Sequence, residues 1–165
     1  LAGSGTAESW PPARRGVMTY YFHEGSLDVP EDWRDESMNI FRAPESEGYN
    51  LVISREKIPR SVDPQAHLAA QRAVIEETLM GFVARDRQSI ELDGQRCVWM
   101  EYTWQSPEGP MNQINVMRVV GDILVSFTFT SGRPFTGAQR DLFRRMLASY
   151  ARAPHLEGDT PTPGR

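Results

Sequence analysis

Hydrophobic and polar residues alternate on either side of a polar turn between residues 37 and 55, which predicts two neighbouring strands. In the first strand, Met38 and Ile40 fall on one face, and Asn39 and Phe41 fall on the other. The apolar residues of the second strand divide in the same way, with Val52 on one face and Leu51 and Ile53 on the other. A half-solvated antiparallel sheet normally shows a polar face to water. We therefore expect one face of this pair to cover the core and the other to receive a partner.

The rest of the chain changes between the helical and the strand period. Asp63 and Pro64 form a typical helix N-terminus, and an apolar stripe continues from there to Gly81. Four strands at hairpin spacing are predicted next, over residues 83–92, 95–104, 111–120 and 122–130. Thr136 and Gln139 then form a capping-box pattern, which predicts a final helix.

These elements predict an α+β fold with an antiparallel β-sheet, in which helices pack on one face and the other face forms a hydrophobic binding groove. At 165 residues the chain is most simply one domain. We assign residues 1–17 to a flexible N-terminal extension, 18–153 to a single domain and 154–165 to a disordered C-terminal tail. Within the domain, residues 19–22 and 26–27 flank a turn.

The last two predicted strands separate an apolar face from a polar, uncharged one. The apolar set is the expected core face and consists of Ile123, Val125, Phe127 and Phe129. The opposite set carries mainly hydroxyl and amide groups and consists of Leu124, Ser126, Thr128 and Thr130, with Gln113, Asn115 and Met117 on the preceding strand. If this set shares a face with Met38, Ile40 and Val52, the surface suits an apolar helix that carries Ser, Thr or Gly. The alternative is ordinary strand surface beneath a loop or a dimer partner.

Composition and charge exclude several classes of function. The net charge of −4 and the lack of a concentrated basic stretch argue against nucleic acid as a partner. The single cysteine, Cys97, and the three histidines, His23, His67 and His155, lack metal-ligand spacing, so no metal or other cofactor is expected. No nucleophile elbow, phosphate loop or dinucleotide fingerprint is present, and we expect no enzymatic activity. No window approaches 18 apolar residues, so a membrane span is not expected.

Residues 18–41 read MTYYFHEGSLDVPEDWRDESMNIF and are followed by VISR at residues 52–55 and YTWQ at residues 102–105. These segments resemble the Eag chaperones, which are effector-associated, DcrB-related proteins of bacterial type VI secretion systems. The resemblance covers about residues 18–154. It implies a PsbP-like α/β sandwich, a homodimer, and a cytoplasmic protein that binds the N-terminal transmembrane helices of PAAR-containing effectors before secretion.

The resemblance also implies which residues bind the effector helices. The apolar positions of the family's groove fall on Met38, Ile40 and Val52, and an amide on the first long helix falls on Gln71. A strand amide matches either Gln113 or Asn115. Together with the face described above, the candidate binding residues are Met38, Asn39, Ile40, Val52, Gln71, Gln113, Asn115, Leu124, Ser126 and Thr128. The two runner-up functions are a lipid- or small-ligand-binding module of the same fold, and an accessory protein that binds only folded soluble partners.

Overall fold

A computed structural model describes residues 16–153 of the chain. Most of the predicted N-terminal extension and all of the predicted C-terminal tail therefore lie outside the described residues. The chain divides after Arg34 into two compact units, which are described separately.

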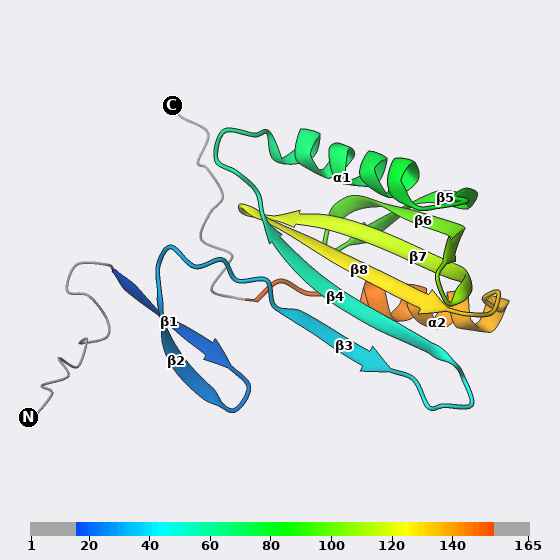
Figure 1. Cartoon of the computed structure of the whole chain (residues 1–165), viewed down its shortest axis with the longest axis horizontal. Coiled ribbons are helices and arrows are strands. Elements are labelled where there is room, and N and C mark those ends of the chain that lie inside the picture. The colour runs from blue at the N-terminus through cyan, green and yellow to red at the C-terminus, as the bar shows by residue number, and fades with distance from the viewer. Residues whose placement is uncertain (1–15, 154–165) are drawn as a thin grey trace, which may run out of the picture. The chain divides into compact units, whose positions relative to one another are not determined.

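The first unit contains a β-hairpin (Figure 1). Strand β1 (Val17–Phe22) pairs antiparallel with β2 (Gly25–Pro30), and the Thr19 hydroxyl donates a 2.8 Å hydrogen bond to Asp28. Both strands are longer than the sequence predicted, because backbone pairing continues past the polar residues that interrupt the apolar pattern.

The second unit is built on a six-stranded antiparallel sheet with the order β3-β4-β8-β7-β6-β5 (Figure 1). Its strands are β3 (Met38–Arg42), β4 (Tyr49–Lys57), β5 (Val83–Leu92), β6 (Gln95–Ser106), β7 (Gly109–Val120) and β8 (Ile123–Ser131). Two helices complete it, α1 (Pro64–Thr78) between β4 and β5, and α2 (Gly137–Ala148) after β8. The predicted α+β class with an antiparallel sheet is confirmed.

The local signals in the sequence act as expected. Asp63 caps α1 by accepting a 2.8 Å hydrogen bond from the Ala66 amide. Thr136 and Gln139 form both hydrogen bonds of a capping box at the start of α2. Asp93, with φ of 46°, lies at the tight turn between β5 and β6, where both central residues need positive φ.

One face of the sheet, which we call the core face, packs against α2. Phe143 of α2 is fully buried there and its ring stacks on Phe129 of β8, with 4.0 Å between centroids. Tyr49 and Phe135 contact the same ring edge-on, at 5.1 and 5.3 Å. Trp99 of β6 is also fully buried in this cluster. The large aromatic core therefore forms between α2 and the sheet.

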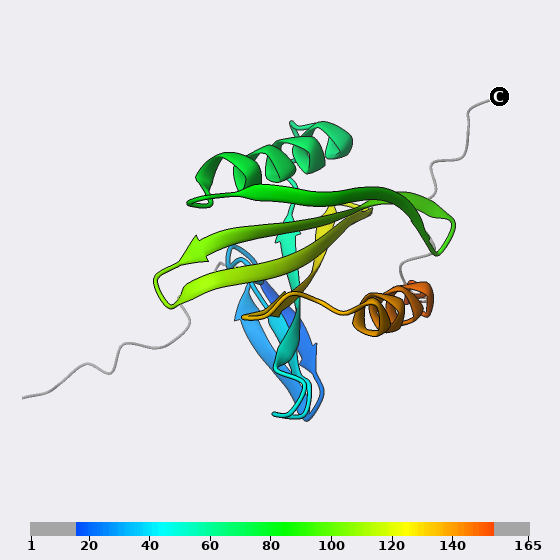
Figure 2. The same cartoon turned by 90° about the vertical axis from the view of Figure 1, so that its right-hand side faces the viewer.

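The opposite face, which we call the amide face because it carries Gln113 and Asn115, packs against α1. Leu68 and Ile75 of α1 contact a second, smaller cluster that contains Met117 and Leu124 of the sheet. Figure 2 shows α1 and α2 on opposite sides of the sheet. The expectation that the helices share one face is therefore wrong, because apolar side chains on both faces each require a cover.

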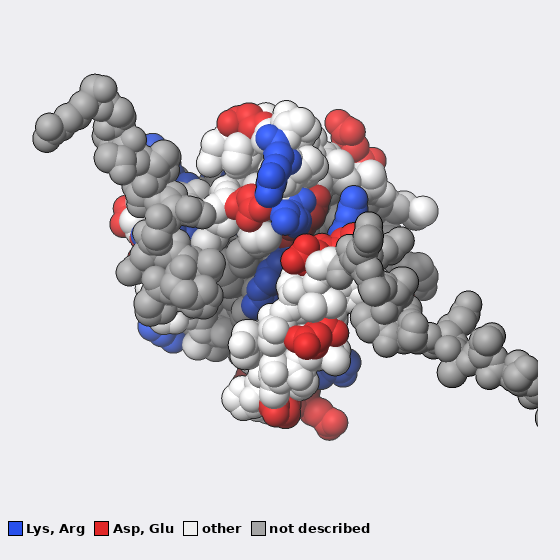
Figure 3. All heavy atoms as spheres, turned by 90° about the vertical axis from the view of Figure 1, so that its left-hand side faces the viewer, with Lys and Arg blue, Asp and Glu red and all other residues white. Residues whose placement is uncertain are grey.

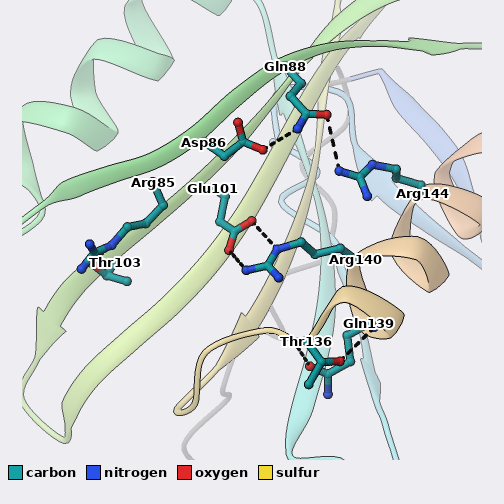
Figure 4. Close-up of polar contacts among 9 residues, drawn as sticks. All are labelled: Arg85, Asp86, Gln88, Glu101, Thr103, Thr136, Gln139, Arg140 and Arg144. Carbon is teal, nitrogen blue, oxygen red and sulfur yellow. Dashed lines mark hydrogen bonds and ion pairs between the residues drawn. The ribbon is translucent and has the colours of Figure 1, made fainter.

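An ion pair between half-buried Arg140 and buried Glu101 holds α2 against the sheet near the N-terminus of the helix (Figure 4). Glu101 is 7% exposed, and its carboxylate accepts hydrogen bonds from Arg140 Nε at 2.8 Å and Arg140 Nη2 at 2.7 Å. The hydrogen bonds that Arg140 donates to this carboxylate raise the pKa of the Arg140 guanidinium. This bidentate geometry fixes the orientation of the first turn of α2.

We predict that Phe143→Ala lowers the free energy of unfolding by about 3–5 kcal/mol, because it leaves a cavity among the aromatic rings. Urea denaturation followed by tryptophan fluorescence measures this change. Phe41→Ala is the control, since Phe41 is 56% exposed, and its effect should stay within about 0.5 kcal/mol. Equal effects of the two substitutions would contradict the proposed core.

We predict that Arg140→Met lowers the free energy of unfolding by about 1.5–3 kcal/mol, because the buried Glu101 carboxylate loses two charge-assisted hydrogen bonds. Arg145→Met, at an exposed position of the same helix, should have little effect in the same urea titration. A neutral Arg140→Met would show that the ion pair does not stabilise the docking of α2.

Candidate functional site

The centre of the amide face is a row of four directly paired residues. Ile40 of β3 pairs with Val52 of β4, Val52 with Thr128 of β8, and Thr128 with Asn115 of β7. Residues that pair directly across antiparallel strands point to the same face. The two apolar and two polar side chains therefore lie side by side across four strands.

Two further rows flank this central row. On one side lie Met38, Ser54, Ser126 and Met117, and on the other lie Arg42, Asn50, Thr130 and Gln113. Of these twelve side chains, Arg42 alone carries a charge. Figure 1 shows that β3 and β4 extend away from α1, so this part of the amide face is not covered by that helix.

The amides on this face are satisfied within the sheet. Asn115 Nδ2 donates to Ser126 Oγ at 2.8 Å and to Thr128 Oγ1 at 2.9 Å. Gln113 Nε2 donates to Thr130 Oγ1 at 3.0 Å. Because all three hydroxyl oxygens accept from an amide, their own protons point elsewhere and can donate to a ligand. The face thus presents three hydroxyl donors at alternate positions of β8.

A tryptophan holds the Gln113 amide in place. Trp104 Nε1 donates a 2.9 Å hydrogen bond to Gln113 Oε1, which fixes the amide so that its nitrogen faces Thr130. Trp104 precedes β7 in the chain and lies on β6, directly opposite Met111. Sequence reasoning missed this role, although the alternation along β6 places Trp104 on the amide face.

Exposure changes sharply across the face. Met38 and Ile40 are 62% and 57% exposed, whereas Asn115 is 4% exposed. On the next strand, β6, Met100 pairs with Asn115 and Tyr102 pairs with Gln113, and both β6 residues are buried. Burial raises the pKa of the Tyr102 phenol. The open surface is therefore most apolar and most accessible at the β3 edge.

The ends of this surface carry the charged groups. Glu56 of β4 continues the same face toward α1, and its carboxylate lies 3.0 Å from His67 Nε2 and 3.5 Å from Gln71 Nε2. Arg42 lies at the opposite end. The middle of the surface is uncharged, so an apolar ligand would meet no isolated charge there.

The structure brings together seven of the ten predicted binding residues. Those side by side on the amide face are Met38, Ile40, Val52, Gln113, Asn115, Ser126 and Thr128, of which Asn115 is only 4% exposed. Leu124 is on the same face but is 3% exposed, because it packs in the cluster under α1. Gln71 projects from α1 to Glu56 at the end of the surface.

Asn39 does not join this group. It pairs directly with Ile53 and therefore lies on the core face of β3. Its side-chain oxygen accepts a 2.8 Å hydrogen bond from Arg55 Nη1. The strand alternation in the sequence already separates Asn39 from Met38 and Ile40. We therefore remove Asn39 from the set of residues that share this surface.

Both candidates for the strand amide belong to the same network, since Gln113 and Asn115 each donate to hydroxyls of β8. Asn50, which sequence reasoning also missed, lies beside Thr130 on this face. Its side-chain oxygen is buried and has no hydrogen-bond partner among the described residues. Asn50 is thus a further acceptor at the border of the open surface.

Charged side chains of both signs are present among the described residues. Across residues 16–153, no group of three His, Cys, Asp or Glu side chains could hold a metal ion. On the side of the molecule drawn in Figure 3, acidic and basic side chains are interspersed. No helix within the described part of the chain is long and apolar enough to cross a membrane.

Known proteins are similar to this chain in sequence and in fold. Over 92 residues, the chain is 34% identical to the protein named effector EagT6 of Pseudomonas aeruginosa, an alignment that covers 54% of this chain and 64% of that protein. The crystal structure of PA94, a protein of unknown function from Pseudomonas aeruginosa, superposes with a TM-score of 0.67 at 24% identity, covering 84% of this chain and 98% of that one. It shows the same fold.

The solution structure of cyanobacterial PsbP (CyanoP) from Synechocystis covers 87% of this chain and 93% of its own at 11% identity. Its TM-score of 0.40 is too low to support a structural argument. The family model of DcrB matches residues 24–149, which include the whole six-stranded sheet and both helices. The chain belongs to the DcrB family.

Proposed function

We propose that this protein is a type VI secretion chaperone that binds and shields the N-terminal transmembrane helices of a PAAR-containing effector in the cytoplasm before secretion. In this proposal it works as a homodimer, without catalytic activity or a cofactor. The observation that carries the proposal is the open amide face, an apolar and hydroxyl-bearing surface without a central charge. The similarity to the protein named effector EagT6 supports the link to a secreted effector.

The chemistry of the amide face matches the way in which transmembrane helices pack. Such helices associate by van der Waals contact and a few hydrogen bonds rather than by ion pairs. Met38, Ile40 and Val52 supply apolar contact area, and the flexible Met38 side chain adapts to an irregular helix surface. The hydroxyls of Ser126 and Thr128 supply donors for Ser, Thr or carbonyl oxygens of a bound helix.

The width of the open surface fits one helix. Four strands spaced about 4.8 Å apart span about 14 Å, and a helix with its side chains is about 10–12 Å wide. The three rows from Met38 to Arg42 extend about 14 Å along the strands, whereas a transmembrane helix is about 30 Å long. One copy of the surface therefore covers about half of a helix, which supports the participation of two copies.

We predict that Val52→Asp prevents co-purification of the chain with its effector's hydrophobic segment. The carboxylate would be buried against hydrocarbon without a compensating positive charge, which should weaken binding by about 3 kcal/mol or more. Pull-down after co-expression measures the loss, and circular dichroism checks the fold. Val83→Asp is the matched control, because Val83 is exposed on the distant strand β5 and should bind normally.

A folded Val52→Asp variant that still binds would contradict the assignment of the site to the amide face. Recovery of a small lipid or ligand, with no binding of the hydrophobic segment, would favour a ligand carrier instead.

We predict that Thr128→Val weakens the same binding by about 0.6–2 kcal/mol, because it keeps the side-chain shape but removes the hydroxyl, which offers a donor to the bound helix and accepts from Asn115 Nδ2. Thr103→Val on the core face of β6 is the control. Titration of the two variants against a detergent-solubilised effector segment measures the difference. Identical affinities would exclude a direct hydrogen bond from Thr128 to the bound helix.

A further inference from the structure

The open part of the amide face carries a charge of opposite sign at each end. Arg42 of β3 pairs with Asn50 of β4 at one end, and Glu56 lies six positions further along β4 on the same face. Six residues of a strand span about 20 Å. Because a helix rises about 1.5 Å per residue, about 13 residues of a helix lying along the strands would separate these two charges.

The Arg42 guanidinium is available to a ligand. Arg42 is exposed and forms no hydrogen bond or ion pair within the described part of the chain. The turn beyond it carries two exposed acidic residues, Glu45 and Glu47. Arg133 lies against the same turn, since its guanidinium occupies the space beside Gly48. The charges of the turn therefore partly offset each other, and Arg42 is the charge that lies on the face itself.

The Glu56 carboxylate at the other end is half exposed. It lies 3.0 Å from His67 Nε2 and 3.5 Å from Gln71 Nε2, and these two residues of α1 hold it at the border of the open surface. Its neighbours on β4, Arg55 and Lys57, point to the core face. No Lys or Arg among residues 16–153 forms an ion pair with Glu56, so its negative charge can act on a ligand.

We propose that these two charges select the flanks of the bound effector segment and fix its orientation. A basic group of the segment lies at Glu56, and an acidic group about 13 residues away along the helix lies at Arg42. The uncharged middle of the surface takes the apolar turns between them. This inference rests on the proposed function and deepens it, because it names the charge pattern of the partner.

The two ends act independently on a bound segment. At physiological salt the Debye length is about 8 Å, well below the separation of about 20 Å between Arg42 and Glu56. A segment with the same charge at both flanks would therefore meet a like charge at one end, whatever its direction. From the strength of exposed ion pairs, we expect each mismatched end to weaken binding by about threefold or more.

Three synthetic segments test this charge pattern. Each has the same apolar helical core in detergent, with flanking residues about 13 positions apart that are lysine and aspartate, two lysines, or two aspartates. We expect the mixed segment to bind about threefold more tightly than either of the others at pH 8, where an ordinary imidazole is uncharged. The preference should disappear at about 1 M salt, where the Debye length is about 3 Å, while the apolar binding persists.

Charge reversal supplies the variants. Arg42→Glu leaves an acidic group at both ends and should make the segment with two lysines the tightest ligand, whereas Glu56→Lys should favour the segment with two aspartates. Arg85→Glu on the distant edge strand β5 is the control and should keep the original order. An unchanged order in Arg42→Glu, or a preference of the unaltered chain for two lysines, overturns the proposal.

Cysteine cross-linking reports the orientation directly. In the background Cys97→Ala, which removes the one native thiol, Ser54→Cys and Asn50→Cys place a thiol toward the Glu56 end and the Arg42 end of the same face. A mixed segment with a cysteine beside its lysine should form a disulfide with Ser54→Cys and little with Asn50→Cys. Equal cross-linking at the two positions overturns a fixed orientation.

The outcomes separate this inference from the proposed function. Equal binding of all three segments would overturn the selection of charged flanks and leave the binding of an apolar helix intact. If the folded chain bound none of the segments, both proposals would be overturned. Circular dichroism establishes that the chain and its variants are folded in each case.

Discussion

Both faces of the six-stranded sheet carry apolar side chains, and the second unit has one helix for each. The buried residues of α2 pack in the aromatic cluster around Phe143 on the core face, and α1 packs on the amide face. Helix α1 meets Met117 and Leu124 near one end of β7 and β8, and it does not extend over Met38 and Ile40. The uneven cover of the second face leaves the surface on which the proposed function depends.

The polar groups of that surface are compatible with an apolar ligand because the sheet already satisfies the amides. Asn115 is nearly fully buried, and an unpaired amide there would cost about 1–3 kcal/mol. Its two donors are used by Ser126 and Thr128. What remains for a ligand is a row of hydroxyl groups, which are small and cost little to desolvate when they find a partner. If the sheet carried a carboxylate or ammonium group in place of these hydroxyls, an apolar ligand would offer it no opposite charge.

Much of this structure could be predicted from the sequence because strand alternation is a local property. The period of two located β4 to β8 and separated Phe127 and Phe129 from Ser126 and Thr128. The caps at Asp63 and Thr136 are likewise local, since each depends on residues within one helical turn.

Which helix covers each face of the sheet could not be predicted in this way. An apolar stripe shows that a helix is buried but not which side of a sheet it covers, so α1 was expected on the wrong side and Leu124 was expected to be accessible. The Trp104 to Gln113 hydrogen bond joins two strands and depends on their register, which single strands do not reveal. Asn39 is different, because alternation alone already placed it on the core face.

Oxidation of Met38 tests the central claim most directly, since it needs no substitution. Met38 is 62% exposed on the amide face, and Met80, which is 75% exposed and follows α1, serves as the internal reference. Hydroxyl-radical labelling with mass spectrometry would compare the chain alone with its complex with the effector's hydrophobic segment. The account predicts that the complex protects Met38 from oxidation while Met80 stays equally reactive. Oxidation of Met38 at the same rate in both samples would contradict binding at the amide face.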